Sequence, residues 1–405
     1  RSSLYNSPLL FIVGANAMKQ FFLILACLPW LAGMGQFFLA ASAMAAPVSI
    51  PLPVLTAKAW IVMDADTGQI LAQSKADSRV EPASLTKMMT TYLVAEALAE
   101  KRLTMTQPVI VSERAWKTQG SRSFIPVNGQ VVVEDLLKGM VIQSGNDASV
   151  ALAEAVGGSE PAFAIMMNRT AQKLGMKDTN FLNASGFFDG PQPTHYSTAH
   201  DMAKLAAALI KNHPEIHRLH AVKEYTYAGI RQYNRNRLLW ADSTVDGLKT
   251  GHSEAAGYCL VATSYRAPRR LISVVLNTPS DAARASDSLN LLNWGYMAFE
   301  AVKVYGAGQT VSQLKVFKGA QNQVKTGFTK DLVVSIPRGM RDKLTVRLES
   351  RQPLLSPVAK GVTVGTLKLS LGDQLWGEYP VMTLEEVPLA GFLGRMWDTL
   401  VLWFQ

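Results

Sequence analysis

Residues 79–94 read RVEPASLTKMMTTYLV, and this stretch decides how the rest of the chain is interpreted. The apolar residues between Leu85 and Tyr92 recur at helical spacing, which predicts a helix with one buried face. Ser84 and Lys87 are three residues apart, so they are neighbours on a different side of the same helix. A hydroxyl beside an amine is either a nucleophile next to its base or two polar groups in water.

The spacing of a serine and a lysine settles nothing by itself, because the chain contains a second copy. Ser312 and Lys315 stand in the alternating run TVSQLKV. A strand directs residues three apart to opposite faces, so that pair cannot cooperate. Ser84 instead follows Pro82 at the start of a predicted helix. Free N–H groups and the helix dipole there favour a serine that becomes an alkoxide-like attacker.

Two further short patterns complete a candidate site. Ser144-Gly145-Asn146 falls between two helical patterns, on an expected tight loop in which glycine gives backbone freedom. The competing interpretation is an N-cap for the following helix, since serine and asparagine are both good caps. Lys249-Thr250-Gly251 enters a predicted strand, where glycine permits the close approach of another backbone. A second Lys-Thr-Gly occurs at Lys325–Gly327, but no Ser-x-Asn lies between it and Ser312.

Ser84 with Lys87, Ser144 with Asn146, and Lys249–Gly251 all lie within one predicted α+β domain, an antiparallel sheet covered by helices. A strand–turn–strand pattern occupies residues 59–74, helical patterns run from about 82 to about 220, and strand patterns follow. A helical pattern at 286–302 is expected to close the domain. We therefore predict a catalytic domain at 51–304 and a small all-β domain at 305–388, where short alternating runs end in Gly, Pro and Asp.

Both ends of the chain carry apolar segments. Residues 1–45 are expected to contain an upstream extension and a secretory signal that begins near Met18, with small residues at Ala43 and Ala45 for cleavage. An uncleaved membrane anchor is the alternative. Residues 389–405 form an amphipathic pattern with two Trp and two Phe, which predicts a helix in a membrane interface. The alternative is a helix docked on its own protein.

Composition excludes several classes of function. A chain of 405 residues with net charge +9 suits two domains, and its scattered Lys and Arg do not indicate nucleic-acid binding. After cleavage only Cys259 would remain, so no intrachain disulfide is expected. The run HPEIHRLH at 213–220 has suggestive metal spacing, but Pro214 disfavours helical geometry at His213. An exposed helix face is the preferred interpretation there, and no metal or other cofactor is predicted.

A Ser-His-Asp triad is also a weak candidate. His195, His200 and Asp201 are close in sequence, but Asp201 stands in capping-box spacing from Thr198 and has a structural role there.

The ordered set resembles a known family. S-x-x-K, Ser-x-Asn and Lys-Thr-Gly, with PASLTKMMTTYLV, SGNDASVALAEAVGG, DGLKTGHSEAAGYCLVATS and LLNWGY, are similar to low-molecular-mass penicillin-binding proteins, the serine-type D-alanyl-D-alanine carboxypeptidases. The resemblance runs over nearly the whole chain after the signal. It implies removal of the terminal D-alanine from peptidoglycan pentapeptides, acylation by β-lactams, and a place on the periplasmic face of the bacterial inner membrane.

The resemblance also implies roles for individual residues. Ser84 would be the acylated nucleophile, Lys87 its general base and Ser144 a proton relay to the leaving D-alanine. Asn146 would hold the substrate amide and orient Lys87, while the backbone N–H groups of Ser84 and His252 would form the oxyanion hole.

The substrate's terminal carboxylate would be received by Lys249 and Thr250 of the Lys-Thr-Gly pattern, which ends at Gly251, together with Arg284. Neutral Lys87 is needed for base catalysis, and we expect burial and the charge of Lys249 to lower its pKa.

Two other functions remain as alternatives. A class A β-lactamase would use a glutamate in a local E-x-x-L-N stretch to deacylate the enzyme, and the chain has no such stretch. A non-catalytic wall-binding protein with the same fold is the second alternative. The loop FFDGPQPTHYSTAHD also departs from the family pattern, which leaves substrate preference open.

Overall fold

The computed structural model describes residues 51–403. The expected signal segment at 1–45 lies outside the described residues, so its cleavage remains a prediction.

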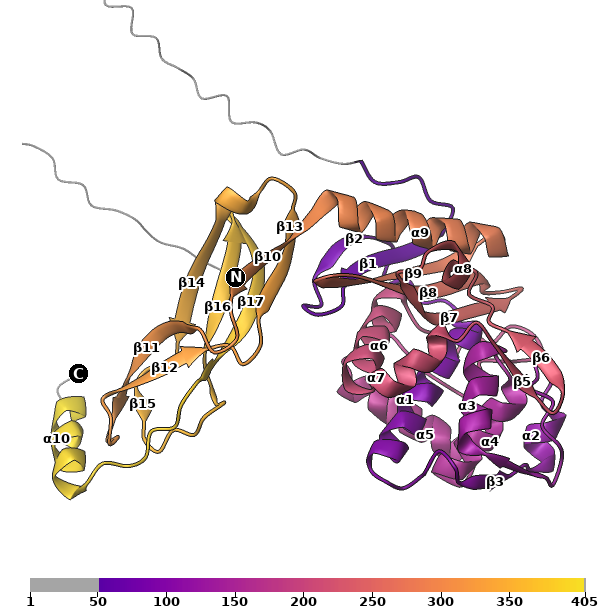
Figure 1. The fold of residues 1–405 in the computed structure, drawn as a ribbon, viewed down its shortest axis with the longest axis horizontal. Helices are drawn as coiled ribbons and strands as arrows, with labels where there is room; N and C mark the ends of the chain where they lie inside the picture. Colours follow the sequence, from indigo (N-terminus) through magenta and orange to yellow (C-terminus); the bar gives the residue numbers. More distant parts are fainter. Residues whose placement is uncertain (1–50, 404–405) are drawn as a thin grey trace, which may run out of the picture. The chain divides into compact units, whose positions relative to one another are not determined.

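A five-stranded antiparallel sheet forms the centre of the first domain (Figure 1). Its strand order is β2-β1-β9-β8-β7. The expected hairpin is β1 (Ala59–Asp64) and β2 (Ile70–Ser74), and the later strands are β7 (Val245–Ser253), β8 (Gly257–Arg266) and β9 (Arg269–Thr278). The N-terminal hairpin therefore pairs directly with strands from about two hundred residues later, through β1 and β9.

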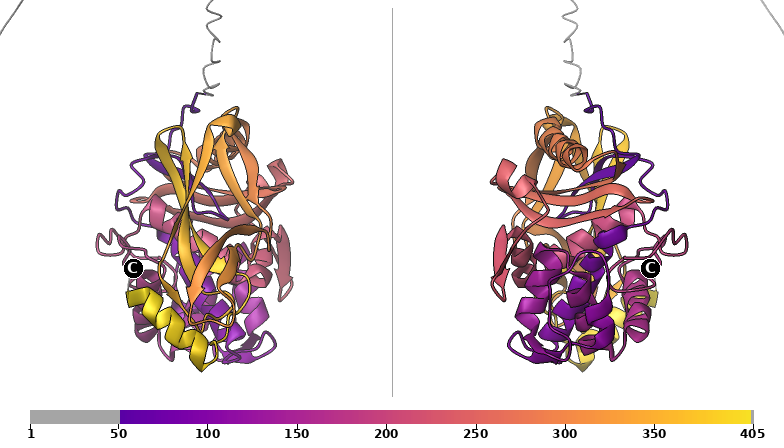
Figure 2. Two further views of the ribbon diagram at one scale, coloured as in Figure 1. Left: turned by 90° about the vertical axis from the view of Figure 1, so that its left-hand side faces the viewer. Right: turned by 90° about the vertical axis from the view of Figure 1, so that its right-hand side faces the viewer.

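Helices cover both faces of this sheet, as Figures 1 and 2 show. Every residue of β1 is buried, and its side chains alternate between two cores. Ile61 and Met63 pack in the core with the helices between α1 and α6, whereas Trp60 and Val62 pack in the core with α9. A strand buried on both faces explains why AWIVMD is almost continuously apolar.

The helices on one side of the sheet supply most of the candidate site. They are the 3₁₀ turn η1 (Ala83–Thr86), α1 (Lys87–Ala99), α2 (Glu113–Lys117), α3 (Val133–Ile142), α4 (Asn146–Gly157), α5 (Glu160–Lys173), α6 (Ala199–Asn212), α7 (Pro214–His217) and η2 (Arg218–Ala221). Two small two-stranded sheets interrupt them, β3 (Pro108–Ile110) with β4 (Gln130–Val132) and β5 (Glu224–Tyr227) with β6 (Ile230–Tyr233). These short strands were not expected from the sequence pattern.

The closing helix ends earlier than its pattern predicts. α8 (Leu238–Ala241) precedes β7, and α9 (Asp281–Ala298) packs on the sheet, but Phe299–Tyr305 forms strand β10. The prediction of helix through residue 302 was wrong at its end, because β10 pairs with β13 (Leu332–Pro337), and Phe299 and Val302 are buried. Tertiary pairing thus overrides a helical local pattern.

The C-terminal domain is all-β, as predicted. Its remaining strands are β11 (Thr310–Phe317), β12 (Gln323–Gly327), β14 (Leu344–Ser350), β15 (Leu354–Leu355), β16 (Thr363–Leu371) and β17 (Gln374–Thr383), with a 3₁₀ turn η3 (Arg341–Lys343). Six of its strands form one sheet in the order β14-β16-β17-β12-β11-β15. The run TVSQLKV is strand β11, as the alternation predicted.

The last described element is helix α10 (Phe392–Trp403), within the segment predicted to be helical. Between residues 51 and 403, no single helix has both the length and the apolar character needed to cross a membrane. The bent pair α4 and α5, which meet at 81°, passes that test by length and composition. Most of α4 and about half of α5 consist of buried residues that pack in the cores of the catalytic domain.

Candidate active site

Ser84 and Lys87 lie side by side at the junction of two helical segments. Ser84 is in the 3₁₀ turn η1, and α1 begins at Lys87. The sequence predicted an α-helix through both residues, whereas the first turn is tighter. In 3₁₀ geometry side chains three apart are nearly eclipsed, and Lys87 Nζ is 2.9 Å from Ser84 Oγ.

Lys87 Nζ lies within hydrogen-bond distance of three oxygen atoms. Its side chain is 1% exposed, and Nζ is 2.7 Å from Asn146 Oδ1 and 2.7 Å from the carbonyl oxygen of Ser185. An ammonium group has three donors and no lone pair. Once neutral, the amine can still donate to Asn146 and Ser185, which leaves its lone pair directed at the Ser84 hydroxyl.

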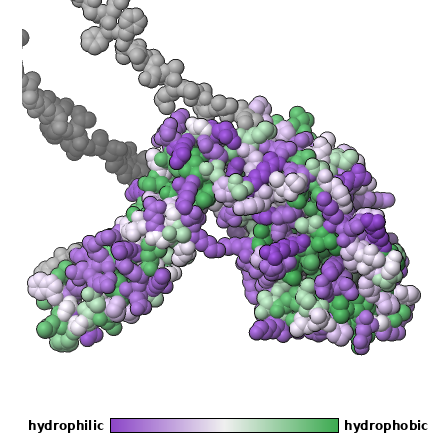
Figure 3. Space-filling model, in the orientation of Figure 1, coloured by the Kyte–Doolittle hydropathy of each residue, from purple (hydrophilic) through white to green (hydrophobic). Residues whose placement is uncertain are grey.

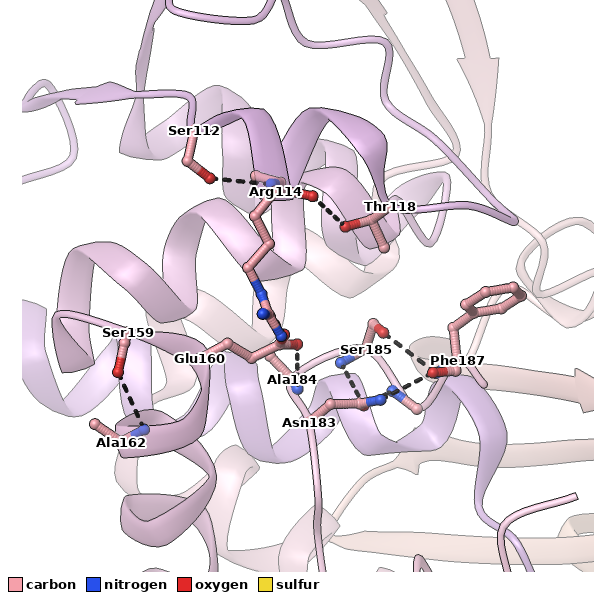
Figure 4. Close-up of polar contacts among 12 residues, drawn as sticks. Ser112, Arg114, Thr118, Ser159, Glu160, Ala162, Asn183, Ala184, Ser185 and Phe187 are labelled. Carbon is pink, nitrogen blue, oxygen red and sulfur yellow. Dashed lines mark hydrogen bonds and ion pairs between the residues drawn. The ribbon is translucent and has the colours of Figure 1, made fainter. Parts of the chain in front are cut away.

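The loop at 183–187, which supplies the Ser185 carbonyl, is held by its own polar side chains (Figure 4). Asn183 Oδ1 accepts from the N–H of Gly186 at 2.7 Å, and Asn183 Nδ2 donates to Phe187 O at 2.8 Å. From α5, Glu160 accepts the Ala184 N–H at 3.2 Å and binds Arg114 at 2.6 Å. Sequence analysis did not single out Ser185, because any residue type can supply a backbone carbonyl. The turn-forming residues around it are the only signal in the sequence.

Ser144 and Asn146 lie at the N-terminal end of α4. Asn146 is the first helical residue, and its Nδ2 donates to Gln119 O at 2.6 Å, so its oxygen faces Lys87. The N-cap interpretation was wrong, because Gly145 is the N-cap residue and no side chain caps the helix. Ser144 has a φ of 67°, a strained left-handed conformation for a residue with a side chain.

Glycine is required at position 145 for a different reason from the one expected. Its φ is −59°, which any residue adopts, so backbone freedom is not what it provides. A Cβ at this position would lie 2.0 Å from Ser123 Oγ. Glycine is therefore needed for close packing against the 119–125 segment, which holds the Ser-Gly-Asn turn near Lys87.

Strand β7 places Lys249 on the other side of the same turn. Lys249 Nζ is 3.0 Å from Ser144 Oγ, and its side chain is buried. The predicted close approach at Gly251 is confirmed, since a Cβ there would lie 2.9 Å from Pro82 O. The glycine therefore lets β7 pack directly on the turn that carries Ser84.

The two buried lysines have lowered pKa values. Burial is the main cause for Lys87 and brings its pKa to about 7, with a further contribution from the positive charge of Arg235. The expected influence of burial is confirmed, and Arg235 is a contributing cation that was not expected. The pKa of Lys249 is lowered by burial first, and then by the charges of Lys87, Arg235 and Arg284.

Ser84, Ser144 and Asn146 open onto one cavity of about 950 Å³. Thr250, Gly251, His252 and Arg284 line it as well, so the structure brings together the residues predicted from the sequence.

Arg284 Nη1 donates to Gly251 O at 3.0 Å. His252 is exposed, and its ring centroid is 4.0 Å from that of Tyr258.

Several charged residues that line this cavity were not singled out from the sequence, among them Arg235, Arg237 and Asp281. The run QYNRNRLLW gave no periodic or motif signal for the two arginines.

The histidine run was misjudged in one respect. His217 and His220 are buried, 5% and 0% exposed, so they do not form an exposed face. Burial lowers the pKa of His217 to about 4 and that of His220 to about 3. His220 Nδ1 is 2.9 Å from Leu248 O, next to Lys249. The predicted departure from helical geometry at His213 is confirmed, with φ −134° and ψ 57°.

His195 and Asp201 also have structural roles. Thr198 Oγ1 accepts the Asp201 N–H at 3.0 Å, as the capping pattern predicted. His195 Nδ1 accepts the Leu182 N–H at 3.0 Å, so the neutral ring carries its proton on Nε2 and donates to Thr86 Oγ1 at 2.8 Å. His195 thereby ties the segment before the 183–187 loop to the turn that carries Ser84.

Comparisons with known proteins agree with this geometry. Residues 44–280 match the family model for D-alanyl-D-alanine carboxypeptidase, Peptidase_S11, and residues 299–389 match the model for the penicillin-binding protein 5 C-terminal domain. The chain is 41% identical to the D-alanyl-D-alanine carboxypeptidase DacC of Escherichia coli, over 91% of this chain and 93% of that protein.

The solved structures that resemble this chain are also penicillin-binding proteins. Penicillin-binding protein 5 from Haemophilus influenzae is similar with a TM-score of 0.76 and 38% identity, covering 84% of this chain and 99% of that one. Penicillin-binding protein D2 from Listeria monocytogenes in its ampicillin-bound form is similar with a TM-score of 0.55 and 32% identity, covering 60% and 98%. This chain therefore belongs to the serine D-alanyl-D-alanine carboxypeptidase family of penicillin-binding proteins.

Proposed function

We propose that this member of the family removes the terminal D-alanine of peptidoglycan pentapeptide stems through an acyl-enzyme on Ser84. The observation that carries the proposal is the environment of Lys87. A buried amine with a pKa of about 7 has its lone pair left for the Ser84 hydroxyl, because two other acceptors occupy its N–H groups. A base with a pKa near the working pH is suited to proton transfer.

Acylation begins when neutral Lys87 takes the hydroxyl proton of Ser84. The Ser84 oxygen attacks the carbonyl carbon between the last two D-alanine residues, and the carbonyl oxygen becomes an oxyanion. Backbone N–H groups of Ser84 and His252 stabilise this charge, in the manner of an oxyanion hole. Asn146 holds the substrate amide while its oxygen keeps Lys87 in place.

The carbon–nitrogen bond then breaks and the leaving amine needs a proton. Ser144 Oγ lies 3.0 Å from Lys249 Nζ, and Asn146, two residues later in the same turn, contacts Lys87. Lys87 gives up the proton that it took from Ser84, Ser144 relays a proton to the amine, and D-alanine leaves with Lys87 neutral again. Lys249, Thr250 and Arg284 receive the terminal carboxylate, and Arg235 adds positive charge at the same cavity.

Deacylation uses the same base in a second round. Lys87 removes a proton from water, the hydroxide attacks the ester carbon, and the Ser84 oxygen recovers the proton. A penicillin would acylate Ser84 by opening its β-lactam ring, and its leaving nitrogen would stay tethered. Slow release of the opened drug then follows, because no E-x-x-L-N stretch supplies the β-lactamase glutamate.

The direct test uses purified protein and a peptide that ends in D-Ala-D-Ala. Release of one D-alanine per peptide, lost in Ser84→Ala together with labelling by a fluorescent penicillin, is the expected result. Rapid nitrocefin turnover would instead support a β-lactamase. Neither reaction would support a non-catalytic wall-binding protein, and unchanged labelling of Ser84→Ala would exclude Ser84 as the nucleophile.

We also propose that the enzyme is exported by the segment at 1–45 and attached peripherally to the periplasmic face of the membrane by residues 389–405. In this division, residues 51–304 form the catalytic domain and residues 305–388 support it. Leu393, Trp397 and Trp403 of α10 are 80%, 68% and 86% exposed, and Figure 3 shows apolar surface at this helix. Asp398 accepts the Lys318 N–H, so a polar side of the helix faces its own domain.

Deleting residues 389–405 tests the attachment. The truncated protein should move from the membrane fraction to the soluble fraction and keep its D-alanine release. Retention in the membrane fraction would contradict the role of this helix. Leu393→Ser with Trp397→Ser is a milder version that keeps Asp398 and its contact.

A further inference from the structure

One carboxylate at the edge of the cavity joins two guanidinium groups. Asp281 Oδ2 is 2.5 Å from Arg237 Nε, and Asp281 Oδ1 binds Arg284 Nη2. Arg237 immediately precedes α8, whereas Asp281 and Arg284 belong to the first turn of α9. All three side chains line the cavity that contains Ser84.

The two arginines differ in how they are held. The side chain of Arg284 is 8% exposed, that of Asp281 28% and that of Arg237 67%. Arg284 also donates to Gly251 O at 3.0 Å, and its guanidinium carbon lies 5.5 Å from the ring centroid of Tyr258. These contacts keep Arg284 in place without Asp281, while Arg237 is an outer, solvated cation that competes for the same carboxylate.

The bond to Gly251 puts Arg284 at the Lys-Thr-Gly end of the cavity. A negatively charged group bound there is attracted by the guanidinium and repelled by Asp281, and the two effects partly cancel. Arg237 in turn neutralises part of the charge on Asp281. The balance among these three side chains therefore adjusts the positive field to which Lys249 and Arg235 also contribute.

We propose that Asp281 and Arg237 are specificity-determining residues that set how strongly the enzyme prefers a leaving residue with a free carboxylate. The negative charge of Asp281 weakens the attraction between Arg284 and that carboxylate. Arg237 neutralises part of the charge on Asp281 and so reduces this effect. A moderate field binds the substrate's terminal carboxylate and still allows the D-alanine product to leave. Neither residue takes part in bond making or breaking. This inference rests on the proposed function.

The test compares two substrates that differ only in this charge. An acyl-Lys-D-Ala-D-Ala peptide with a free carboxylate and its C-terminal amide are both assayed, and the ratio of their kcat/KM values is measured. Loss of folded enzyme or of general activity lowers both values and cancels in the ratio. The variants are Asp281→Asn and Arg237→Gln in the full chain.

The two variants should move the ratio in opposite directions. Asp281→Asn should raise the preference for the carboxylate substrate about three- to fivefold, and Arg237→Gln should lower it about twofold. Glu254→Gln is the matched control, since Glu254 lines the same cavity and binds no arginine among residues 51–403. Its effect on the ratio should be less than half that of Asp281→Asn.

The outcomes separate this inference from the proposed function. If the wild type releases no D-alanine from the carboxylate peptide, the proposed function fails and the inference with it. If the wild type is active but Asp281→Asn leaves the ratio unchanged or lowers it, the inference alone is overturned. A ratio that changes equally in Glu254→Gln would also overturn it, because a long-range charge effect would then explain the result.

Discussion

The catalytic domain and the C-terminal β-domain contain the same two short patterns in very different settings. Ser84 and Ser144 line one cavity and contact the buried Lys87 and Lys249, respectively, whereas Ser312 and Lys315 lie on strand β11 with Lys315 exposed. The second Lys-Thr-Gly pairs with that strand, so Ser312 stands opposite Thr326. The same spacing therefore has different results: the helical turn puts Ser84 and Lys87 in contact and Lys87 is buried, whereas a strand directs residues three apart to opposite faces.

The largest expected effect is the loss of the proposed base, Lys87. Lys87→Arg keeps the positive charge but cannot be neutral near pH 7, so acylation by a fluorescent penicillin should slow by about a thousandfold. Lys315→Arg is the matched control in the β-domain and should leave the rate unchanged. Equal effects of the two substitutions would remove the distinction between the two copies.

A second way to sharpen the comparison is pH. Because the pKa of Lys87 is lowered to about 7, the neutral base is lost as pH falls below that value. The acylation rate constant should decrease about tenfold per unit and be about a hundredfold lower at pH 5 than on its plateau. Stopped-flow labelling between pH 5 and 9 measures this. A flat profile would show that Lys87 is not the group that titrates.

Glycine substitutions compare the two Lys-Thr-Gly copies directly. A Cβ at Gly251 would lie 2.9 Å from Pro82 O, and one at Gly327 would lie 2.3 Å from Gln309 O. Both alanine variants should lose about 1–3 kcal/mol of unfolding free energy through overpacking. Only Gly251→Ala should slow acylation, about tenfold, because it displaces the turn that carries Ser84. Urea unfolding and labelling rates on both variants test this.

The smallest effect concerns acid stability. All six histidines precede the β-domain in the sequence, and burial lowers the pKa of His195 to about 4. The unfolded chain, with an ordinary pKa near 6.5, takes up the proton first, so stability is lost as pH falls below that value. Between pH 7 and 5, His195→Gln should lose about 2 kcal/mol less unfolding free energy than the wild type.

Urea unfolding of the full chain at both pH values provides the measurement. Lys315→Arg serves as the control and should lose as much stability as the wild type. An equal loss in His195→Gln would mean that His195 is not buried in its neutral form.

The local sequence pattern predicted secondary structure correctly where the conformation depends on a single element. The hairpin at 59–74, the helix after Ser84, the strand at Ser312 and the cap at Thr198 were all predicted correctly. Each depends on periodicity or on contacts within a few residues, which the order of amino acids records directly.

Prediction failed where a distant segment supplies the partner. Phe299–Tyr305 became a strand because β13 pairs with it, and the histidines at 217 and 220 are buried because other elements cover them. The role of Gly145 was misjudged for the same reason, since the atom it accommodates belongs to Ser123.

The sequence by itself determined which groups we propose as the reacting ones. The order of Ser84 and Lys87, Ser144 and Asn146, and Lys249 to Gly251 within one α+β pattern was enough to propose a nucleophile and its partners. Only the tertiary structure decided their protonation and their surroundings. The Ser185 carbonyl, Arg235 and the pair of arginines on Asp281 act through space across loops and helices. Their influence depends on distance and burial, and the spacing of residues along the sequence predicts neither quantity.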